Sequence, residues 1–404
     1  MIQYDKLDNG LRVVTEKMPD ALSATVAMRV EVGARDESYE ISGASHFLEH
    51  LLFKGTSTRS SFEIAQELDV MGGISNAATS IEQTTYYVKI VKDDLEAGLD
   101  LLTDIISDPA FREEEIETER QVILEEIKMH EDNPASVCFD NLISICYKDS
   151  LIGKSVQGTI DTVSSIKRDE IRNFWDANYK LENIIVAAAG AIDHEYLIKK
   201  VSEGLTGRSG GSEFVREAPK FHPNVESKIE KDFNQTTVAM AYDSIPDCDE
   251  KRNALVILNA VFGGSYSSRL FQEVREKLGL VYSIDSGWMG CSDCGLSIIS
   301  FGTSSENVNT VIKVIKTEID KILEDGITEK ELEIAKRSIK ADFAMSFETS
   351  SSRMSRISSL VAVFDKVYSI EEQMEKFMSV TLEDVKQIAT EIFSKPYSIS
   401  EVGL

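Results

Sequence analysis

A glycine-rich segment divides this sequence into two halves in which strands and helices are expected in the same order. The segment runs from Gly204 to Lys220 and reads Gly-Leu-Thr-Gly-Arg-Ser-Gly-Gly-Ser before a charged stretch that contains Pro219. This composition is typical of a linker. Because a chain of 404 residues exceeds what one ordinary hydrophobic core holds, the sequence predicts an α+β protein with two similar domains from an internal duplication.

Hydrophobic periodicity places the elements of the first half. Residues 25–33 alternate between apolar and other side chains, as a half-buried strand does, and 84–91 are rich in aromatic and β-branched residues. Between them, 61–71 has helical spacing and stops at Gly72-Gly73. Further helices are expected at 93–107, 113–131, 134–147 and 167–179, and a buried strand at 184–190.

The second half repeats this order at low sequence similarity. Strands are expected at 236–242, 280–287, 295–302 and 397–402. Helices are expected at 249–262, 267–278, 306–323, 328–347, 350–364 and 381–393. We therefore predict an N-terminal domain over 1–207, a linker over 208–222 and a C-terminal domain over 223–404.

A short histidine motif in the first half contains candidate metal ligands. His46 and His50 are four residues apart, so on a helix their imidazoles lie on one face. At this spacing both can hold one zinc ion. Glu49 precedes the second histidine, where its carboxylate can reach a metal-bound water and act as general base. The order His-x-x-Glu-His is a metallopeptidase motif, and it is improbable by chance in a chain with five histidines.

The acidic helix expected at 113–131 offers candidates for a third ligand. Glu119 and Glu126 are seven residues apart and lie along one edge of its isoleucine stripe, whereas Glu125 points to nearly the opposite side. Geometry therefore favours Glu119 or Glu126 over Glu125 without ranking the two. Two histidines and one glutamate leave a fourth position open for water, as in catalytic rather than structural zinc sites.

The second half does not repeat these ligands. When Leu332 is aligned with Ile116, Ala335 falls opposite Glu119 and Asp342 falls opposite Glu126. The second half also contains no His-x-x-Glu-His string. One half is therefore expected to hold a metal ion and the other is not.

Composition narrows the classes of protein to consider. The formal net charge of −26 disfavours nucleic acid as a partner and favours basic peptides among peptide substrates. Five scattered cysteines indicate reduced thiols and a cytoplasmic protein. The N-terminus has no basic region followed by an apolar run, so no signal peptide is expected, and no segment has the apolar length of a membrane span.

Several motifs together resemble the pitrilysin family of zinc metallopeptidases, the inverzincins. They are SHFLEHLLFKGT at 45–56, GGISNAATS at 72–80 and ERQVILEEIK at 119–128, with a looser match, SRLFQEVREKLGLVY, at 268–282. Over essentially its whole length the chain looks like a half-size bacterial relative of the β subunit of mitochondrial processing peptidase. The resemblance implies two homologous α/β-sandwich domains of the metallopeptidase LuxS-like fold, which form half of a clamshell.

The resemblance also implies roles for individual carboxylates. It puts the third zinc ligand on Glu126, with one zinc ion per chain, so that His46, His50 and Glu126 form the metal set. It makes Glu119 a carboxylate that orients the site.

Substrate-binding residues follow from the same resemblance. Asn76 and Ala77 match the edge strand that binds substrate backbone. Arg275 and Tyr282 match the arginine and tyrosine that steady the scissile carbonyl, and Arg269 competes with Arg275 for the arginine role.

The implied activity is zinc-dependent endopeptidase cleavage of short or unfolded peptides in an enclosed chamber. Since the chain has half the domains of longer relatives, the resemblance implies a homodimer in which the second half of one copy completes the site of the other. Two alternatives stay open: a non-catalytic scaffold subunit, and a catalytic subunit that needs a different, inactive partner chain. The intact set of His46, Glu49, His50 and Glu126 argues against the scaffold.

Overall fold

The computed structural model describes residues 2–210 and 216–403, which fold into two compact units. Unit 1 comprises Met1–Lys128, Lys154–Glu217 and Ala344–Tyr368; unit 2 comprises Met129–Gly153, Ala218–Phe343 and Ser369–Leu404. The units therefore differ from contiguous halves, because each contains one segment from the opposite half of the sequence. Part of the expected linker, 211–215, lies outside the described residues.

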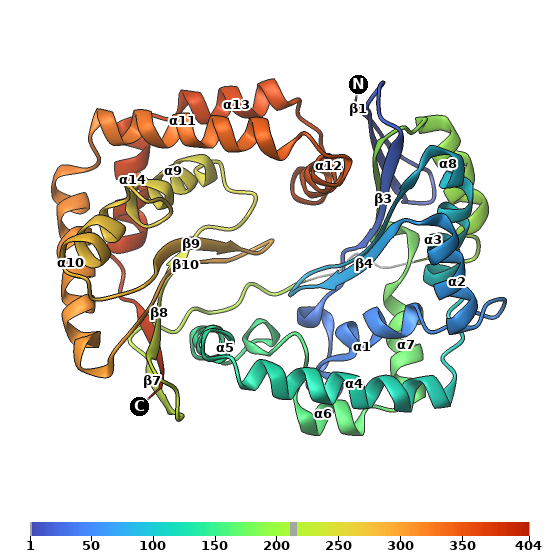
Figure 1. The fold of residues 1–404 in the computed structure, drawn as a ribbon, viewed down its shortest axis with the longest axis horizontal. Coiled ribbons are helices and arrows are strands. Elements are labelled where there is room, and N and C mark those ends of the chain that lie inside the picture. Colours follow the sequence, from blue (N-terminus) through green and yellow to red (C-terminus); the bar gives the residue numbers. More distant parts are fainter. Residues whose placement is uncertain (1, 211–215, 404) are drawn as a thin grey trace. The chain divides into compact units, whose positions relative to one another are not determined.

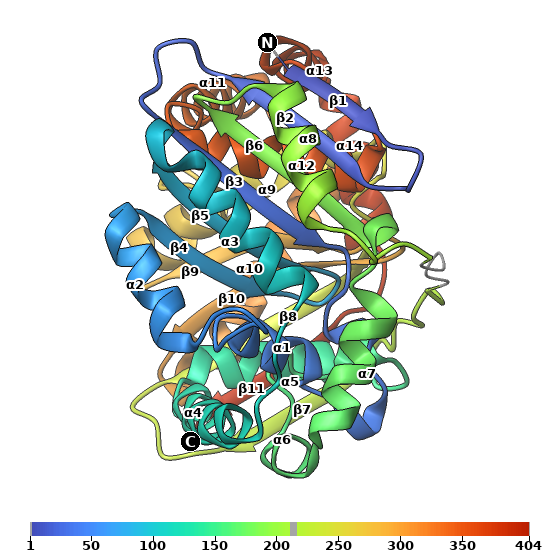
Figure 2. The ribbon, with the colours of Figure 1, turned by 90° about the vertical axis from the view of Figure 1, so that its right-hand side faces the viewer.

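Unit 1 contains a six-stranded sheet, seen face-on in Figure 2. Its order is β1 (Ile2–Lys6), β2 (Arg12–Lys17), β6 (Ile184–Gly190), β3 (Ser23–Val30), β5 (Thr84–Val91) and β4 (Ile74–Thr79). β2 and β6 are parallel and the other neighbours are antiparallel. Every residue of β6 is buried, as expected for an apolar central strand with both faces covered.

Helices cover both faces of this sheet (Figure 1). One face packs against α1 (Ala44–Leu52), α3 (Leu95–Ser107), α7 (Arg168–Asn178) and α8 (His194–Gly204). The other face packs against α12 (Ser350–Phe364) through Met354, Ile357 and Val361. The remaining helices of the unit are α2 (Ser61–Met71), α6 (Ile160–Ser165) and most of α4 (Glu113–Glu131).

A buried ion-pair cluster explains why α12, from the second half of the sequence, belongs to unit 1. Glu16 in β2 is buried and its carboxylate pairs with the guanidinium groups of Arg353 and Arg356. An unpaired buried carboxylate would be strongly unfavourable. The apolar contacts and these charges together fix α12 on the sheet.

Unit 2 repeats the topology of unit 1 without its first strand. The order is β7 (Glu226–Glu230), β11 (Ser398–Gly403), β8 (Thr236–Ser244), β10 (Gly295–Thr303) and β9 (Ile284–Gly290). β7 runs parallel to β11, as β2 does to β6, and the other neighbours are antiparallel. The predicted fold class, a duplicated α+β domain, is confirmed.

The helices of unit 2 also follow the order of unit 1 (Figure 1). α9 (Arg252–Phe262), α10 (Val308–Asp325), α11 (Glu329–Ser346) and α14 (Leu382–Phe393) share one core, and α5 (Pro134–Cys146) packs against β8 and β11. The sequence did not predict α13 (Ile370–Ser379). The strand expected at 280–287 lies at 284–290, and the helix expected at 267–278 contains a π-helical stretch, η6 (Phe271–Lys277).

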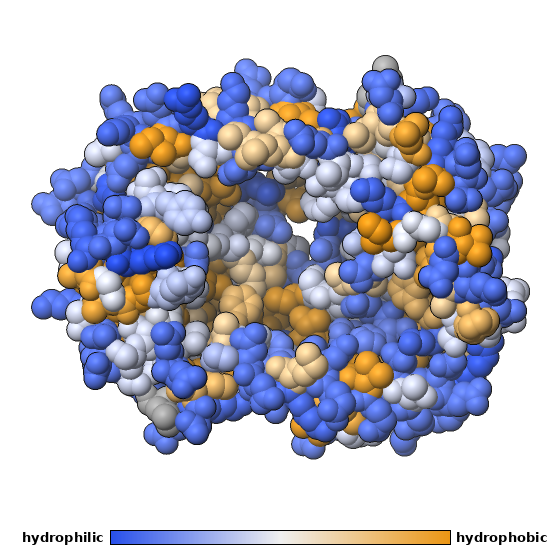
Figure 3. All heavy atoms as spheres, viewed as in Figure 1, coloured by the Kyte–Doolittle hydropathy of each residue, from blue (hydrophilic) through white to orange (hydrophobic). Residues whose placement is uncertain are grey.

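Hydrophilic side chains cover much of the face seen in Figure 3, in keeping with the charge of the chain. Among the described residues, no helix is both long enough and apolar enough to cross a membrane.

Candidate metal centre

The motif helix α1 has one buried face and one polar face. Phe47, Leu48, Leu51 and Leu52 are buried in the core of unit 1, so the histidines and glutamate of the motif lie on the remaining face. The helix begins after Gly43, whose φ of 99° is left-handed. A Cβ at Gly43 would lie 2.7 Å from the carbonyl oxygen of Gln157, so both backbone conformation and space require glycine there.

Glu37 caps the N-terminus of α1. Its two carboxyl oxygens accept hydrogen bonds from the backbone N–H groups of Gly43 and Ser45, each at 2.7 Å. A glycine N-cap has no side chain to satisfy such donors, and Glu37 supplies the acceptors instead. Burial raises the pKa of Glu37 to about 8, although the two N–H groups act in the opposite direction.

α4 brings Glu126 to the motif histidines. Ile116, Ile123 and Ile127 are buried as their spacing predicts, which leaves Glu126 at the edge of the stripe. Its Oε2 lies 3.6 Å from His46 Nε2 and 3.4 Å from His50 Nε2, and one ligand atom from each of the three residues falls within 4.8 Å of the others.

This donor set fits zinc. With metal–ligand bonds of about 2.0–2.1 Å, tetrahedral ligands are separated by roughly 3.3 Å, close to the distances between the glutamate oxygen and the two imidazole nitrogens. Burial, and then the neighbouring His50, lower the pKa of His46 to about 4. The His46 imidazole is therefore neutral at pH 7, as a metal ligand must be.

Glu119 supports the second histidine from behind. Its Oε2 lies 3.0 Å from His50 Nδ1, and its Oε1 lies 2.8 Å from Lys54 Nζ. With Nε2 facing Glu126, His50 donates its Nδ1–H to Glu119. Burial disfavours the charged forms of both residues. The contacts with His50 and Lys54 nonetheless lower the pKa of Glu119. The hydrogen bond to Glu119 and the charge of Glu126 raise the pKa of His50.

A threonine at the end of β4 orients the candidate base. The hydroxyl of Thr79 donates a hydrogen bond of 2.6 Å to Glu49 Oε2. In the core near Glu49, the buried hydroxyls of Tyr86 and Tyr179 lie 2.9 Å apart. Burial raises the pKa of Tyr86 well above its ordinary value, with smaller contributions from Tyr179 and from the charge of Glu49. The base thus has one fixed donor and two neutral phenols near it.

β4 is an edge strand with main-chain groups directed outward. The Ala77 N–H donates to the side-chain oxygen of Asn76, whereas the Ser80 N–H donates to the carbonyl of Gln83 in the adjoining turn. Because main-chain groups alternate in an antiparallel ladder, Asn76 faces β5 and Ala77 faces the free edge. The predicted substrate-binding pair therefore lies on a strand that can accept another.

Arg275 and Tyr282 lie together in unit 2. The Arg275 guanidinium is 4.6 Å from the ring centre of Phe271 and 5.2 Å from that of Tyr282, whose residue is 79% exposed. Arg269, its competitor in the sequence, instead binds both oxygens of Glu331 and the carbonyl of Gly326. These contacts favour Arg275 for the substrate role, which stays a prediction.

Three supporting residues were not assigned roles from the sequence. Lys54 and Thr79 occur within the motif strings, but nothing in their spacing shows what they contact. Glu37 lies outside every motif, and only the fold brings it to the start of α1. The available sequence signal for Glu37 was an acidic residue shortly before a helix whose N-cap is a glycine and has no capping side chain.

Comparison with known proteins identifies both halves. Residues 12–160 match the family model "Insulinase (Peptidase family M16)", and residues 165–339 match "Peptidase M16 inactive domain". An uncharacterized zinc protease of Mycobacterium tuberculosis is 37% identical over 98% of this chain and 92% of its own length. An uncharacterized zinc protease of Bacillus subtilis is 34% identical over 100% and 98%.

Solved structures agree on the fold. A protease from Helicobacter pylori superposes with a TM-score of 0.93 at 24% identity, covering 100% of this chain and 99% of that one. A peptidase M16 inactive domain protein from Pseudomonas fluorescens gives 0.93 at 19%, covering 100% and 98%. The predicted family of metallopeptidases is thereby confirmed: the chain belongs to peptidase family M16.

Proposed function

We propose that this protein is a zinc-dependent endopeptidase of short or unfolded peptides. The observation that carries the proposal is the convergence of His46, His50 and Glu126 on one point, with Glu49 on the same helix. Membership in a peptidase family and the relatives named as zinc proteases support it.

His46, His50 and Glu126 would hold the metal through two imidazole nitrogens and one carboxylate oxygen. A zinc ion held this way acidifies a water molecule and polarises a peptide carbonyl. Two neutral imidazoles and one carboxylate leave the ion with net positive charge, which suits that Lewis-acid role.

Glu49 acts as general base and then as general acid. Its carboxylate takes the proton of the attacking water, and the same oxygen returns that proton to the leaving amine. The Thr79 hydroxyl, bound to Oε2, restricts the carboxylate to one orientation. The other oxygen, Oε1, is left for the water.

The substrate backbone adds to β4 as an extended strand. The outward-facing groups of Ala77 supply a donor and an acceptor, and the Asn76 side chain, which bonds the Ala77 N–H, gives way to the substrate. Thr79 is the last residue of β4 and contacts Glu49. The register of the substrate on β4 therefore determines which peptide bond lies next to Glu49. Arg275 and Tyr282 are proposed to hold the scissile carbonyl.

We also propose one zinc ion per chain, a cytoplasmic location and a homodimer that encloses the peptide. The negative charge of the chain supports a preference for basic peptides. The alternatives are a scaffold subunit and a catalytic subunit with an inactive partner chain. A purified protein that holds zinc but cleaves peptides only after a second chain is added would establish the latter.

The test is hydrolysis of a set of unfolded peptides by wild type, Glu49→Gln and Glu125→Gln, with zinc measured on each preparation. Glu125 is the matched control, since it lies on α4 paired with Lys128 and exposed to solvent. We expect Glu49→Gln to keep zinc and lose about 10²–10⁴-fold in rate, and Glu125→Gln to match wild type. Cleavage at the wild-type rate by Glu49→Gln would overturn the mechanism.

A further inference from the structure

We infer that Lys54 is a positioning residue of the metal centre, which fixes Glu119 so that Glu119 holds the His50 imidazole; the inference rests on the proposed function. Lys54 follows the end of α1, four residues after His50. It touches no ligand of the metal, so it acts only through Glu119.

The contacts form a short chain from Lys54 to the ligand. Lys54 Nζ binds Glu119 Oε1 at 2.8 Å, and Glu119 Oε2 binds His50 Nδ1 at 3.0 Å. The Glu119 side chain is 4% exposed, so solvent does little to orient it. A carboxylate is planar, so an ammonium group that holds one oxygen also restricts the position of the second oxygen.

Comparison with unit 2 tests whether the fold itself needs Lys54. Aligning Leu48, Leu51 and Leu52 of α1 with Leu258, Val261 and Phe262 of α9 matches buried residues to buried residues. In this alignment His50 corresponds to Ala260 and Lys54 to Gly264. The equivalent helix thus folds with neither a ligand nor a lysine.

The α4 and α11 helices complete the comparison. Ile123 and Glu119 of α4 correspond to Ile339 and Ala335 of α11, and all four are buried. Glu119 and Lys54 are therefore both replaced in unit 2, by residues without charge.

A neighbouring cation behaves differently. Arg120 donates to the carbonyls of Val163 and Ile166, at the C-terminal end of α6. The equivalent Lys336 donates to the carbonyls of Met378 and Val380, at the C-terminal end of α13. Because this contact persists in both units it serves the fold, whereas the Lys54–Glu119 pair occurs only in the unit that holds the metal residues.

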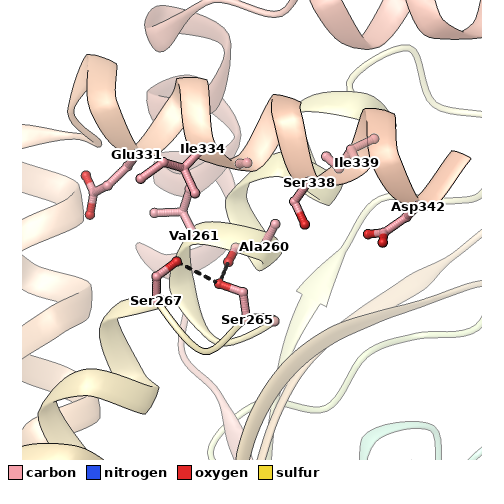
Figure 4. A pocket seen from close by; sticks show the side chains of 11 residues that line it. Ala260, Val261, Ser265, Ser267, Glu331, Ile334, Ser338, Ile339 and Asp342 are labelled. Carbon is pink, nitrogen blue, oxygen red and sulfur yellow. Dashed lines mark hydrogen bonds between the residues drawn. The ribbon is translucent and has the colours of Figure 1, made fainter. Parts of the chain in front are cut away.

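A hollow in unit 2 marks the missing side chains (Figure 4). It has a volume of about 130 Å³ and is lined by Ala260, Gly264, Ala335 and Asp342 among others. These are the counterparts of His50, Lys54, Glu119 and Glu126. Unit 2 therefore folds with this space left open where unit 1 has the side chains of His50, Lys54 and Glu119, so the fold does not need them.

The experiment measures the zinc dissociation constant by competition with a chromophoric chelator. We expect Lys54→Met to weaken zinc binding by about 10- to 100-fold, the usual effect of losing support behind a metal-bound histidine. Lys54→Arg keeps a cation within reach and restores most of the affinity. Lys128→Met removes an equivalent but exposed lysine–glutamate pair of α4 and should bind zinc as wild type does.

Thermal unfolding of the metal-free proteins separates positioning from folding. Metal-free Lys54→Met should unfold within about 2 °C of wild type. A zinc affinity unchanged in Lys54→Met, or a loss matched by Lys128→Met, would overturn the inference. So would an unfolding temperature lowered enough to account for the lost affinity. Wild type that binds zinc but cleaves no peptide would overturn the proposed function and leave the Lys54 inference standing.

Discussion

The α1–α4 pair of unit 1 and the α9–α11 pair of unit 2 occupy equivalent places in the duplicated fold but carry different side chains. In unit 1 the space between the helices holds two imidazoles, two carboxylates and an ammonium group. In unit 2 the counterparts of His46, His50 and Glu119 are Val256, Ala260 and Ala335, and no cluster of metal-binding side chains occurs among residues 129–153, 218–343 and 369–403.

The difference shows which residues the fold requires. Sheet order, the apolar stripe of α4 or α11 and the cation that caps the following helix are shared. Lys54 and Glu119 have uncharged counterparts in unit 2, whereas Glu126 corresponds to another carboxylate, Asp342. Burying a charged group is unfavourable unless it is paired. We attribute the presence of Lys54 and Glu119 in unit 1 to the proposed metal site, which is the basis of the predictions below.

The largest effect is expected when a proposed metal ligand of unit 1 is replaced by the residue at the equivalent position of unit 2. His50→Ala recreates Ala260 and removes one of the imidazole nitrogens, so bound zinc should fall from about one per chain to none, and hydrolysis with it. His130→Ala is the control, since His130 is paired with Asp140 in unit 2. Metal analysis after desalting checks both. Full zinc occupancy in His50→Ala would show that His50 is not a zinc ligand, and that its replacement by Ala260 does not explain the difference between the two units.

The edge strands β4 and β9 are equivalent in topology: β4 packs against α1, which carries the motif, and β9 packs against α9, which lacks it. Ala77→Pro removes an N–H that faces the free edge, a position where proline is tolerated in a strand. We expect kcat/KM to fall about tenfold or more through lost backbone hydrogen bonds, with zinc content unchanged. Ala77→Ser keeps the N–H and should cleave normally. Equal kinetics for both variants would remove β4 as the substrate strand.

A smaller effect is expected from Thr79, the group that orients the proposed base Glu49. Its counterpart strand in unit 2 has no base to orient. Thr79→Val keeps the shape of the side chain and removes the hydroxyl that binds Glu49. We expect kcat to fall about three- to tenfold, with KM and zinc binding unchanged and with recovery in Thr79→Ser. A KM effect alone would assign Thr79 to substrate binding instead.

The cap of α1 predicts a pH effect on the stability of unit 1. Burial raises the pKa of Glu37 to about 8, above the value of about 4.3 in an unfolded chain. Between these values the unfolded chain has lost its proton and the folded chain has kept it. The free energy of unfolding therefore falls as pH rises from about 4.5 to about 8, by at most about 1.4 kcal/mol per pH unit.

Urea unfolding of the metal-free protein at several pH values checks this effect. Glu37→Gln carries no titrating group and should show a shallower decline of unfolding free energy with pH than wild type. Identical pH dependence of the two proteins would mean that Glu37 is ionised in the folded state, held so by the N–H groups of Gly43 and Ser45.

The sequence predicted the periodic parts of this molecule well. The strand at β5, the isoleucine stripe of α4 and the spacing of His46 and His50 are local patterns, and each predicts its own structure. The alternation at 25–33 predicted a strand correctly but a half-buried one, whereas β3 is buried on both faces because α12 covers the second face. The replacement of Glu119 by Ala335 in the second half was also visible, because the stripe fixes the alignment of the two helices.

The contacts that the sequence did not reveal join residues distant in the chain. Glu37 reaches α1 through a turn, Lys54 reaches Glu119 across two helices, and Thr79 reaches Glu49 from an edge strand. The assignment of α12 to unit 1 depends on Glu16 at the far end of the sequence. Helix α13 was not predicted, although Ile370, Met374 and Phe377 have helical spacing and Ser369 with Glu372 forms a capping box.

The most direct test of the comparison is zinc stoichiometry in a matched pair of variants. Glu126→Ala and Asp342→Ala remove corresponding carboxylates from the two units. We predict about one zinc ion per chain in wild type and in Asp342→Ala, and none in Glu126→Ala. Two zinc ions in wild type, or loss of zinc in Asp342→Ala, would contradict the claim that the duplicated scaffold holds its metal in the first unit.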